Sequence, residues 1–396
     1  MENIRHSNSS TILFFVKPRF VSHRERISGV YAAAIKRGWQ VHLIEAPPTS
    51  ASIRTYVKLL RPIGCLVDIS TFDETIDRRM FGKLPSVLIS RDTTRKKQIL
   101  DCSCQNSFEP VQLAVEVLSG LGMTDFAFIG DPMRPYWSVK RGELFRKSLP
   151  ANARAFEFDL PPDTIDGHRA MKAWLRALPK PCGCFLAADH LALSLYSVAA
   201  EVGLKIGIDL PTIGVDNDEQ RCLSLTPHLS SIKLNFFLAG ENAVALLERR
   251  LEEPDNPPQM MTYGALGVMR RGSTNPIFPD MRVTRAMLFI TEHGCENISV
   301  ADVAETMGCC GRLAEKLFRM HAKMSILDAI HQVRMDKAFY LLKNQAIPID
   351  AIPFQCGYGA SPAYLKTYFK KQTGMTMREW RRNSLQQSRG NHLTCM

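Results

Sequence analysis

The chain has 396 residues and a net charge of +11, which allows two or three domains that each bury a core and favours an anionic partner. Its 11 cysteines lack the repeated spacing of a zinc site, and no apolar run is long enough to cross a bilayer. We therefore expect no metal, no cofactor and no membrane contact. Because no apolar signal-peptide core follows the start, we expect a cytoplasmic protein with reduced thiols.

The first two thirds of the chain alternate short apolar strands with amphipathic helices. Strands are predicted over residues 11–16, 39–45, 63–69, 86–90, 125–130, 183–188 and 212–215. Helices are predicted over residues 26–38, 53–60, 110–122, 138–149 and 190–203. Continuous apolar strands between helices indicate parallel sheets covered on both faces, and two such blocks fit two α/β lobes.

Polar residues that directly follow these strands are candidates for a ligand site. Ligands of such sheets bind beyond the carboxyl ends of the strands, so the expected site is the cleft between the lobes. Asp68, Asp189 and Asp216 hold such positions. Each of them could instead cap a helix or close a turn, which is the alternative interpretation.

A segment rich in Pro, Gly and charge, "RRGSTNPIFPDMR", separates this region from the last hundred residues. We expect a first domain over residues 11–274, a linker over 275–282 and a second domain over 283–383. Residues 1–10 and 384–396 are expected to be disordered.

The second domain is predicted to hold two helix-turn-helix units. Ser299 is a good N-cap for a helix over 300–307 that Gly308 ends, and a second helix with a basic outer stripe follows. In this motif the second helix enters the major groove of DNA. The pattern recurs about fifty residues later. A predicted helix over 326–342 joins the units, and its length of roughly 25 Å can hold two reading helices about one DNA turn apart.

The polar positions of this domain are the DNA-binding candidates. For base contacts by the first unit we choose Arg312, Glu315, Lys316 and Arg319; for the second unit, Ser361, Lys366 and Thr367. For phosphate contacts we choose Lys370, Lys371, Arg381 and Arg382. Between Ala360 and Arg382 only Glu379 is acidic, which suits the salt-sensitive phosphate term of DNA binding. The alternative is a helical domain with an ordinary solvated basic face.

The runs "VADVAETMGCC", "IDAIPFQCGY" and "GMTMREWRR" together resemble the DNA-binding domain of AraC/XylS-type transcription activators. Several positions depart from the family pattern. Cys310 stands where a Ser usually caps the first reading helix. In the second helix-turn-helix unit, Pro348 takes a capping position and Pro353 replaces a helical Ala. The stretch through "GASP" is one residue longer than usual. These departures affect the geometry of the second helix-turn-helix unit, on which its base contacts depend.

A second resemblance covers the region before the linker. "FAFIG" followed by Arg141, then "LAADHLAL", "PTIGVDND" and "VMRRGST", are similar to the LacI/GalR-type periplasmic-binding-protein fold that senses sugars. This sensor placed before an AraC-type reader resembles the xylose-operon regulators. The resemblance implies sugar contacts at Asp189, Asp216, Arg141, Arg24, Trp137 and Asn217.

No Gly-rich phosphate loop or GxSxG elbow is present, so the sequence does not indicate an enzyme. The resemblances imply a two-lobed α/β sensor followed by an all-α double helix-turn-helix domain. We expect a sugar-responsive regulator, an activator of a pentose-utilisation operon, that binds promoter DNA as a homodimer and recruits RNA polymerase. The alternative is a sugar sensor whose degenerate DNA-binding domain acts through protein contacts.

Overall fold

The structure is a computed structural model that describes residues 10–72, 77–90, 100–159, 164–276, 278–343 and 347–390. The chain forms two compact units. The first consists of residues 1–107 and 235–264, and the second of residues 108–234 and 265–396. The segment 1–9 and the end of the tail, 391–396, for which disorder was expected, lie outside the described residues.

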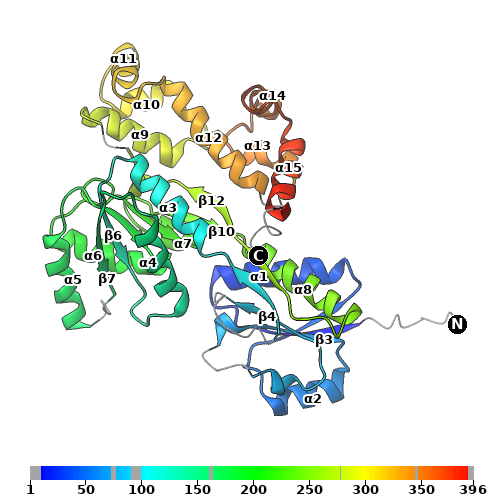
Figure 1. The fold of residues 1–396 in the computed structure, drawn as a ribbon. Helices are drawn as coiled ribbons and strands as arrows, with labels where there is room; N and C mark the ends of the chain where they lie inside the picture. Colours follow the sequence, from blue (N-terminus) through cyan, green and yellow to red (C-terminus); the bar gives the residue numbers. More distant parts are fainter. Residues whose placement is uncertain are drawn as a thin grey trace. The chain divides into compact units, whose positions relative to one another are not determined.

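The first unit is a parallel sheet with helices on both faces. Its six strands pair in the order β11-β5-β4-β3-β1-β2, with α1 and α8 on one face and α2 on the other (Figure 1). Because β1 is buried on both faces, its sequence TILFF shows no polar alternation. The bounds are β1 Thr11–Phe15, α1 Val21–Ile35, β2 Gln40–Ile44, α2 Ser50–Leu60, β3 Gly64–Asp68, η1 Ile69–Thr71, η2 Arg78–Phe81, β4 Ser86–Ser90, β5 Asp101–Gln105, α8 Phe236–Glu252 and β11 Met260–Tyr263.

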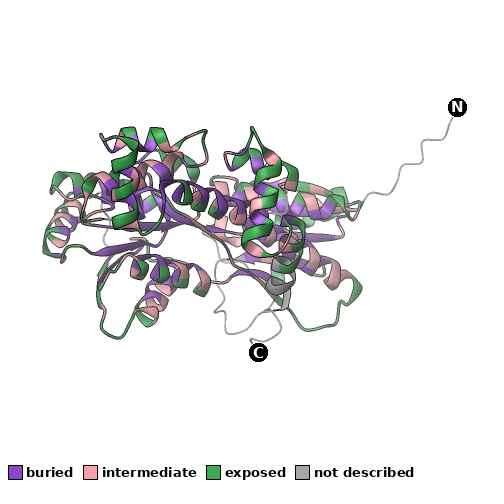
Figure 2. Cartoon of the chain, turned by 90° about the horizontal axis from the view of Figure 1, so that it is seen from above, coloured by how far each residue is buried: buried purple, intermediate pink, exposed green. Residues whose placement is uncertain are grey.

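The second unit contains another six-stranded sheet, in the order β12-β10-β9-β8-β6-β7. Its strands are parallel except for β12, which runs antiparallel to β10. The strands are largely buried, whereas the helices expose their outer sides (Figure 2). The bounds are α3 Phe108–Gly120, β6 Asp125–Ile129, α4 Tyr136–Ser148, β7 Arg154–Phe158, α5 Ile165–Ala177, β8 Gly183–Leu186, η3 Asp189–Leu191, α6 Ala192–Glu201, β9 Thr212–Val215, α7 Glu219–Leu223, β10 Ser230–Leu234, β12 Ala265–Met269 and η4 Gly272–Thr274.

The same unit continues into an all-α region built around one long helix, α12. Helices α9 to α11 lie around one end of α12 and α13 to α15 around the other (Figure 1). Each group has its own apolar core, centred on Phe318 in the first and on Phe369 in the second. The bounds are α9 Met281–His293, α10 Val300–Thr306, α11 Gly311–Ala322, α12 Ile326–Lys343, η5 Ile349–Ala351, α13 Ile352–Gln355, α14 Pro362–Thr373 and α15 Met377–Gly390.

The local signals of the helical region are confirmed. Ser299 and Asp302 form a reciprocal capping box at α10, and Gly308 follows that helix with a φ of 64°. Cys310 caps α11 without a side-chain hydrogen bond. Pro353 lies in the first turn of α13, where a proline removes no helical hydrogen bond.

Some elements differ from what the sequence pattern predicts. β5 has the polar sequence DCSCQ yet is fully buried between β4 and β11. Its Asp101 carboxylate accepts hydrogen bonds from Arg250 Nε (2.7 Å) and the backbone N–H of Gln259 (2.7 Å). β7 lies at the edge of its sheet, where the described residues pair it with β6 alone, and it exposes Arg154, Ala155 and Glu157. Helix α15 continues to Gly390, into the segment expected to be disordered.

Candidate ligand site and DNA-binding surface

The loops after β8 and β9 bring three predicted ligand residues together at the carboxyl ends of the strands of the second sheet, an end that we call the ligand edge. Asp189 follows β8, and Asp216 and Asn217 follow β9; the two strands are parallel neighbours. Asp216 has a φ of 107° and Asn217 a φ of 51°. Non-glycine residues rarely adopt such angles, and they concentrate at binding and catalytic sites. The loop after β9 is therefore the most distinctive backbone feature of the ligand edge.

Asp189 is 3 % exposed, and its carboxylate is held by three donors. The Ser231 hydroxyl donates at 2.7 Å, the Asp218 amide at 2.9 Å and the Cys222 thiol at 3.5 Å. Burial, followed by the nearby charge of Asp216, raises the pKa of Asp189 to about 7 despite these hydrogen bonds. Asp189 thus fastens the loop after β9 to β8 and β10.

Arg141 and Trp137 reach the ligand edge from α4. Arg141 is fully buried, its Nη1 donates to the Ala187 carbonyl just after β8, and its guanidinium carbon lies 5.1 Å from the centroid of the Trp137 ring. An arginine over an aromatic face is attracted by the ring quadrupole, which orients the guanidinium. The structure therefore places a cation and an aromatic ring beside the acidic loops.

Arg271 is a further residue of this cluster that the sequence reasoning did not assign. Its Nη2 donates to Asn217 Oδ1 at 2.8 Å and its Nη1 to the Leu229 carbonyl at 2.8 Å. The backbone N–H of Asn217 in turn donates to Ser231 Oγ at 3.0 Å. Asn217 is only 2 % exposed, so Arg271 and Ser231 together fix the strained loop. The available signal was the position of Arg271 in the "VMRRGST" run.

The other two predicted ligand residues belong to the first unit and differ from each other. Asp68 is fully buried in an ion pair with Arg26 at 2.7 Å and also accepts hydrogen bonds from Ser70. Burial raises the pKa of Asp68, but the Arg26 charge and the hydrogen bonds outweigh this and lower it overall. Asp68 thus stabilises the packing of β3 against α1. Arg24 is exposed on α1.

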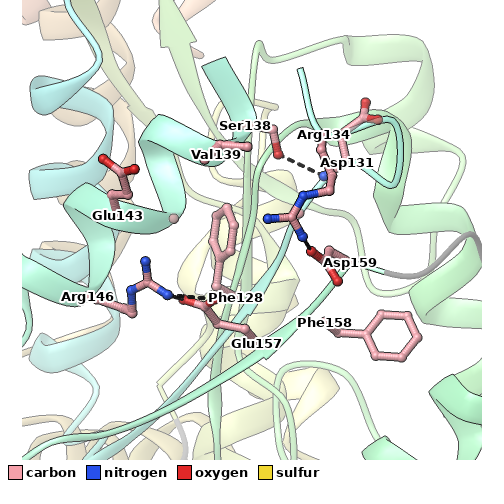
Figure 3. Close-up of a pocket in the computed structure, with 12 residues that line it drawn as sticks. Phe128, Asp131, Arg134, Ser138, Val139, Glu143, Arg146, Glu157, Phe158 and Asp159 are labelled. Carbon is pink, nitrogen blue, oxygen red and sulfur yellow. Dashed lines mark hydrogen bonds and ion pairs between the residues drawn. The ribbon is translucent and has the colours of Figure 1, made fainter. Parts of the chain in front are cut away.

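A hollow of about 430 Å³, solvent at its mouth included, lies beside β6, β7 and α4 (Figure 3). Two ion pairs join charged side chains of its lining. Arg134 pairs with Asp159, and Arg146 Nη1 donates to Glu157 Oε2 at 2.9 Å. None of the predicted ligand residues lines this hollow. We therefore do not assign the ligand to it.

The predicted reading face of the first helix-turn-helix unit lies on α11. Arg312 and Lys316 are exposed, and no ion pair involves either of them within the described parts of the chain. Arg319 is exposed as well, but its Nε donates to Glu315 Oε1 at 2.8 Å. The other oxygen of Glu315 accepts from the Ile326 amide at 3.3 Å and so caps α12. The structure thus gives Glu315 a stabilising role at the start of α12.

The second helix-turn-helix unit also exposes its predicted residues, which lie on α14. Several of them form ion pairs or hydrogen bonds within the chain. Lys366 Nζ pairs with Asp350 Oδ1 at 2.7 Å, and the Thr367 hydroxyl donates to the Ala363 carbonyl at 3.2 Å. Ser361 holds the N-cap position without a side-chain hydrogen bond. Lys370 and Lys371 are exposed in the last turn.

Arg381 and Arg382 have different surroundings although they are adjacent. Arg381 is half-buried and donates to the carbonyls of Leu341, Leu342 and Ile347 at 3.3, 2.9 and 2.8 Å. Burial lowers the pKa of its guanidinium. Arg381 therefore satisfies carbonyls at the end of α12, while Arg382 is exposed.

Comparison with protein families agrees with these two regions. Residues 115–274 match a periplasmic binding protein-like domain, and residues 281–383 match a helix-turn-helix domain. The chain therefore carries a periplasmic binding protein-like domain followed by a helix-turn-helix domain, the combination of a sugar-responsive, DNA-binding transcription regulator. This regulator is not an enzyme. Within the described residues, no helix is long and apolar enough to cross a membrane.

Two relatives are similar in sequence over about 70 % of the chain. The regulator is 28 % identical over 284 residues to the Xylose operon regulatory protein of Escherichia coli (strain K12), covering 70 % of this chain and 72 % of the relative. The protein of the same name from Haemophilus influenzae is 25 % identical over 281 residues, covering 69 % and 72 %. The solved structure of the xylose-binding transcription activator xylR covers 95 % of this chain and 98 % of its own, with 23 % identity and a TM-score of 0.57. That likeness supports the two-sheet fold followed by helices.

Proposed function

We propose that this regulator binds promoter DNA through α11 and α14 under the control of a small sugar, with a pentose as the expected class. The observation that best supports DNA binding is that Arg312 and Lys316 are both exposed on α11. Long cations in this position of a recognition helix contact guanine edges or phosphates in the major groove. The alternative, a degenerate reader that acts through protein contacts, is less well supported because Pro353 lies where it leaves the helix intact.

The proposed sugar contacts are Arg141, Trp137, Asp189, Asp216 and Asn217, which all belong to the second unit. The sugar contact of Arg24, in the first unit, stays a prediction from the sequence. A carboxylate accepts from neighbouring hydroxyls, a guanidinium donates in a planar fork, and an aromatic ring covers an apolar sugar face. The names of the relatives, which refer to a xylose operon and to xylose binding, favour a pentose. Asp68 is not included, because its carboxylate forms a buried ion pair with the Arg26 cation, whereas the donors to Asp189 are uncharged groups.

A bonded route connects the proposed ligand loop with the first helix of the DNA-binding region. Arg271 bonds to Asn217 on one side and precedes η4 on the other. Just after η4, Asn275 Nδ2 donates to the Thr284 carbonyl of α9 at 3.2 Å, and the Thr291 hydroxyl donates to Asn275 Oδ1 at 3.3 Å. A ligand that favours one arrangement of the loop can thereby shift the arrangement of α9.

Regulation of this kind implies further partners. We propose that the protein acts as a homodimer on repeated DNA sites, recruits RNA polymerase as an activator and works in the cytoplasm. Two reading units at the ends of α12 suit one half-site that covers two successive major grooves. A dimer would then place two such half-sites on one promoter.

Sugar binding and its specificity are tested by thermal-shift screening of the full-length protein against monosaccharides. We expect one or a few pentoses to raise the melting temperature, because a ligand that binds only the folded state stabilises it. Asp216→Ala should weaken binding by roughly tenfold or more, since each hydrogen bond to a charged group contributes about 1.5–3 kcal/mol. Asp166→Ala, which alters an exposed carboxylate on α5, is the matched control. An unchanged response in Asp216→Ala would exclude this ligand site.

DNA binding is tested by footprinting the full-length protein on the DNA upstream of its own gene. Protection over two successive major grooves supports the proposal. Sequence-independent binding that is abolished by moderate salt would instead support the degenerate reader.

A further inference from the structure

A cluster of four aromatic rings joins α12 to the second reading helix. The Tyr364 ring lies 5.8 Å from His331 and 5.9 Å from Tyr368, with interplanar angles of 27° and 12°. It also lies 5.7 Å from the ring of Tyr358, whose hydroxyl is 2.7 Å from His331 Nδ1. Contacts with three rings fix the position of the Tyr364 side chain.

Tyr364 nevertheless remains 46 % exposed, unlike its neighbours Tyr358 and His331, which are 6 % and 8 % exposed. It lies in the first turn of α14, which begins at Pro362. The first turns of a recognition helix are the part that contacts base edges. A large, exposed and rigid side chain in this position was absent from the predicted reading set.

The polar candidates of the same helix are less available. Lys366 is paired with Asp350 at 2.7 Å, and the Thr367 hydroxyl is bonded to the Ala363 carbonyl at 3.2 Å. Each interaction occupies a donor of the side chain, so contact with DNA through Lys366 or Thr367 competes with an interaction inside the chain. Tyr364 requires no such change, and a ring that is already held loses little conformational entropy on binding.

We propose that Tyr364 is a specificity-determining residue of the second helix-turn-helix unit and packs its ring against the C5-methyl group of a thymine in the major groove. This proposal rests on the proposed DNA-binding function and assigns a chemistry to its second reader. Apolar contact with the thymine methyl distinguishes thymine from the other bases. Burying one methyl group changes affinity by about fourfold.

The test uses duplexes that the full-length protein selects from a random DNA pool, with each thymine replaced in turn by uracil. Uracil lacks only the methyl group. At one thymine in the half-site of the second helix-turn-helix unit, we expect the uracil duplex to bind the wild-type protein about fourfold more weakly than the thymine duplex. This scan depends on no substitution in the protein. If no thymine there is sensitive to uracil, the proposal is wrong.

Tyr364→Ala should bind the thymine duplex more weakly and no longer distinguish uracil from thymine at that position. Tyr364→Phe keeps the ring and should retain the difference, which separates loss of contact from loss of folding. Phe354→Ala is the matched control, because Phe354 is a 61 % exposed aromatic residue on α13 of the same unit. A uracil profile that survives Tyr364→Ala would refute this assignment while leaving DNA binding intact. Failure to select any sequence would overturn the proposed function itself.

Discussion

Replacing Asp68 by alanine removes one partner of a fully buried ion pair, so it should destabilise the first unit rather than act on a ligand. The variant leaves the Arg26 guanidinium buried, with Ser70 Oγ at 2.6 Å and Tyr263 OH at 3.2 Å as its remaining hydrogen-bond partners in the described set. Loss of one partner of a buried pair costs about 3–5 kcal/mol. The two remaining hydroxyls favour the lower end, about 3 kcal/mol.

Hydrogen exchange followed by mass spectrometry measures this effect on α1 and β3, within the first unit alone. A loss of about 3 kcal/mol accelerates exchange limited by unfolding roughly a hundredfold. Because the pKa of Asp68 is lowered in the folded state, the wild-type advantage is fully present at neutral pH. It is lost as the pH falls from the unfolded value, about 3.9, through the folded pKa.

Arg24→Ala provides the control, because Arg24 is exposed on the same helix and its removal should change stability by less than about 0.5 kcal/mol. The double variant Arg26→Met, Asp68→Leu should recover much of the loss, since no unpaired charge remains. Exchange in Asp68→Ala as slow as in Arg24→Ala would refute the stabilising role. A selective loss of sugar binding at unchanged exchange would instead return Asp68 to the ligand site.

Three further predictions concern side chains of the second unit. Glu315→Ala should lower the stability of the helical region by about 1 kcal/mol in urea unfolding, because it removes a cap of α12 and the partner of Arg319. Arg381→Ala should lower the melting temperature, whereas Arg382→Ala should leave it unchanged and reduce the slope of log affinity against log salt by about 1. Asp189 has a pKa of about 7 when folded, so wild-type stability should fall as pH rises from about 4 to 7; Asp189→Asn should flatten this dependence in a pH series of melting temperatures.

Local signals allowed the helical region to be predicted from the sequence. The capping box of Ser299 involves only four consecutive residues, and the apolar face of α12 recurs at helical spacing. The ligand edge, which carries Asp189 and Asp216, was also predictable, because parallel strands place their carboxyl ends together. In these cases the deciding interactions lie within one element or follow from one general rule of topology.

Side-chain partners that are distant in the chain could not be predicted in the same way. Arg26 and Asp68 are separated by 42 positions, and Asn217 and Arg271 by 54. No periodicity in the sequence connects such pairs. Asp68 therefore looked like a ligand residue because of its place after a strand, while Arg271 was overlooked. Position in a topology restricts where a binding residue can lie, but the hydrogen bonds of each carboxylate decide whether it is available.

The two reading helices differ in the chemistry they expose, and this difference bears on how DNA recognition is divided. α11 exposes Arg312 and Lys316, which can donate to guanine and to phosphates. In its first turns, α14 holds Lys366 in an ion pair and exposes the packed ring of Tyr364, whereas its exposed cations Lys370 and Lys371 lie in the last turn. Charged contacts release counterions, whereas an apolar methyl contact does not. Substitutions on α11 should therefore change the salt dependence of binding, and substitution of Tyr364 should change base preference at nearly constant salt dependence.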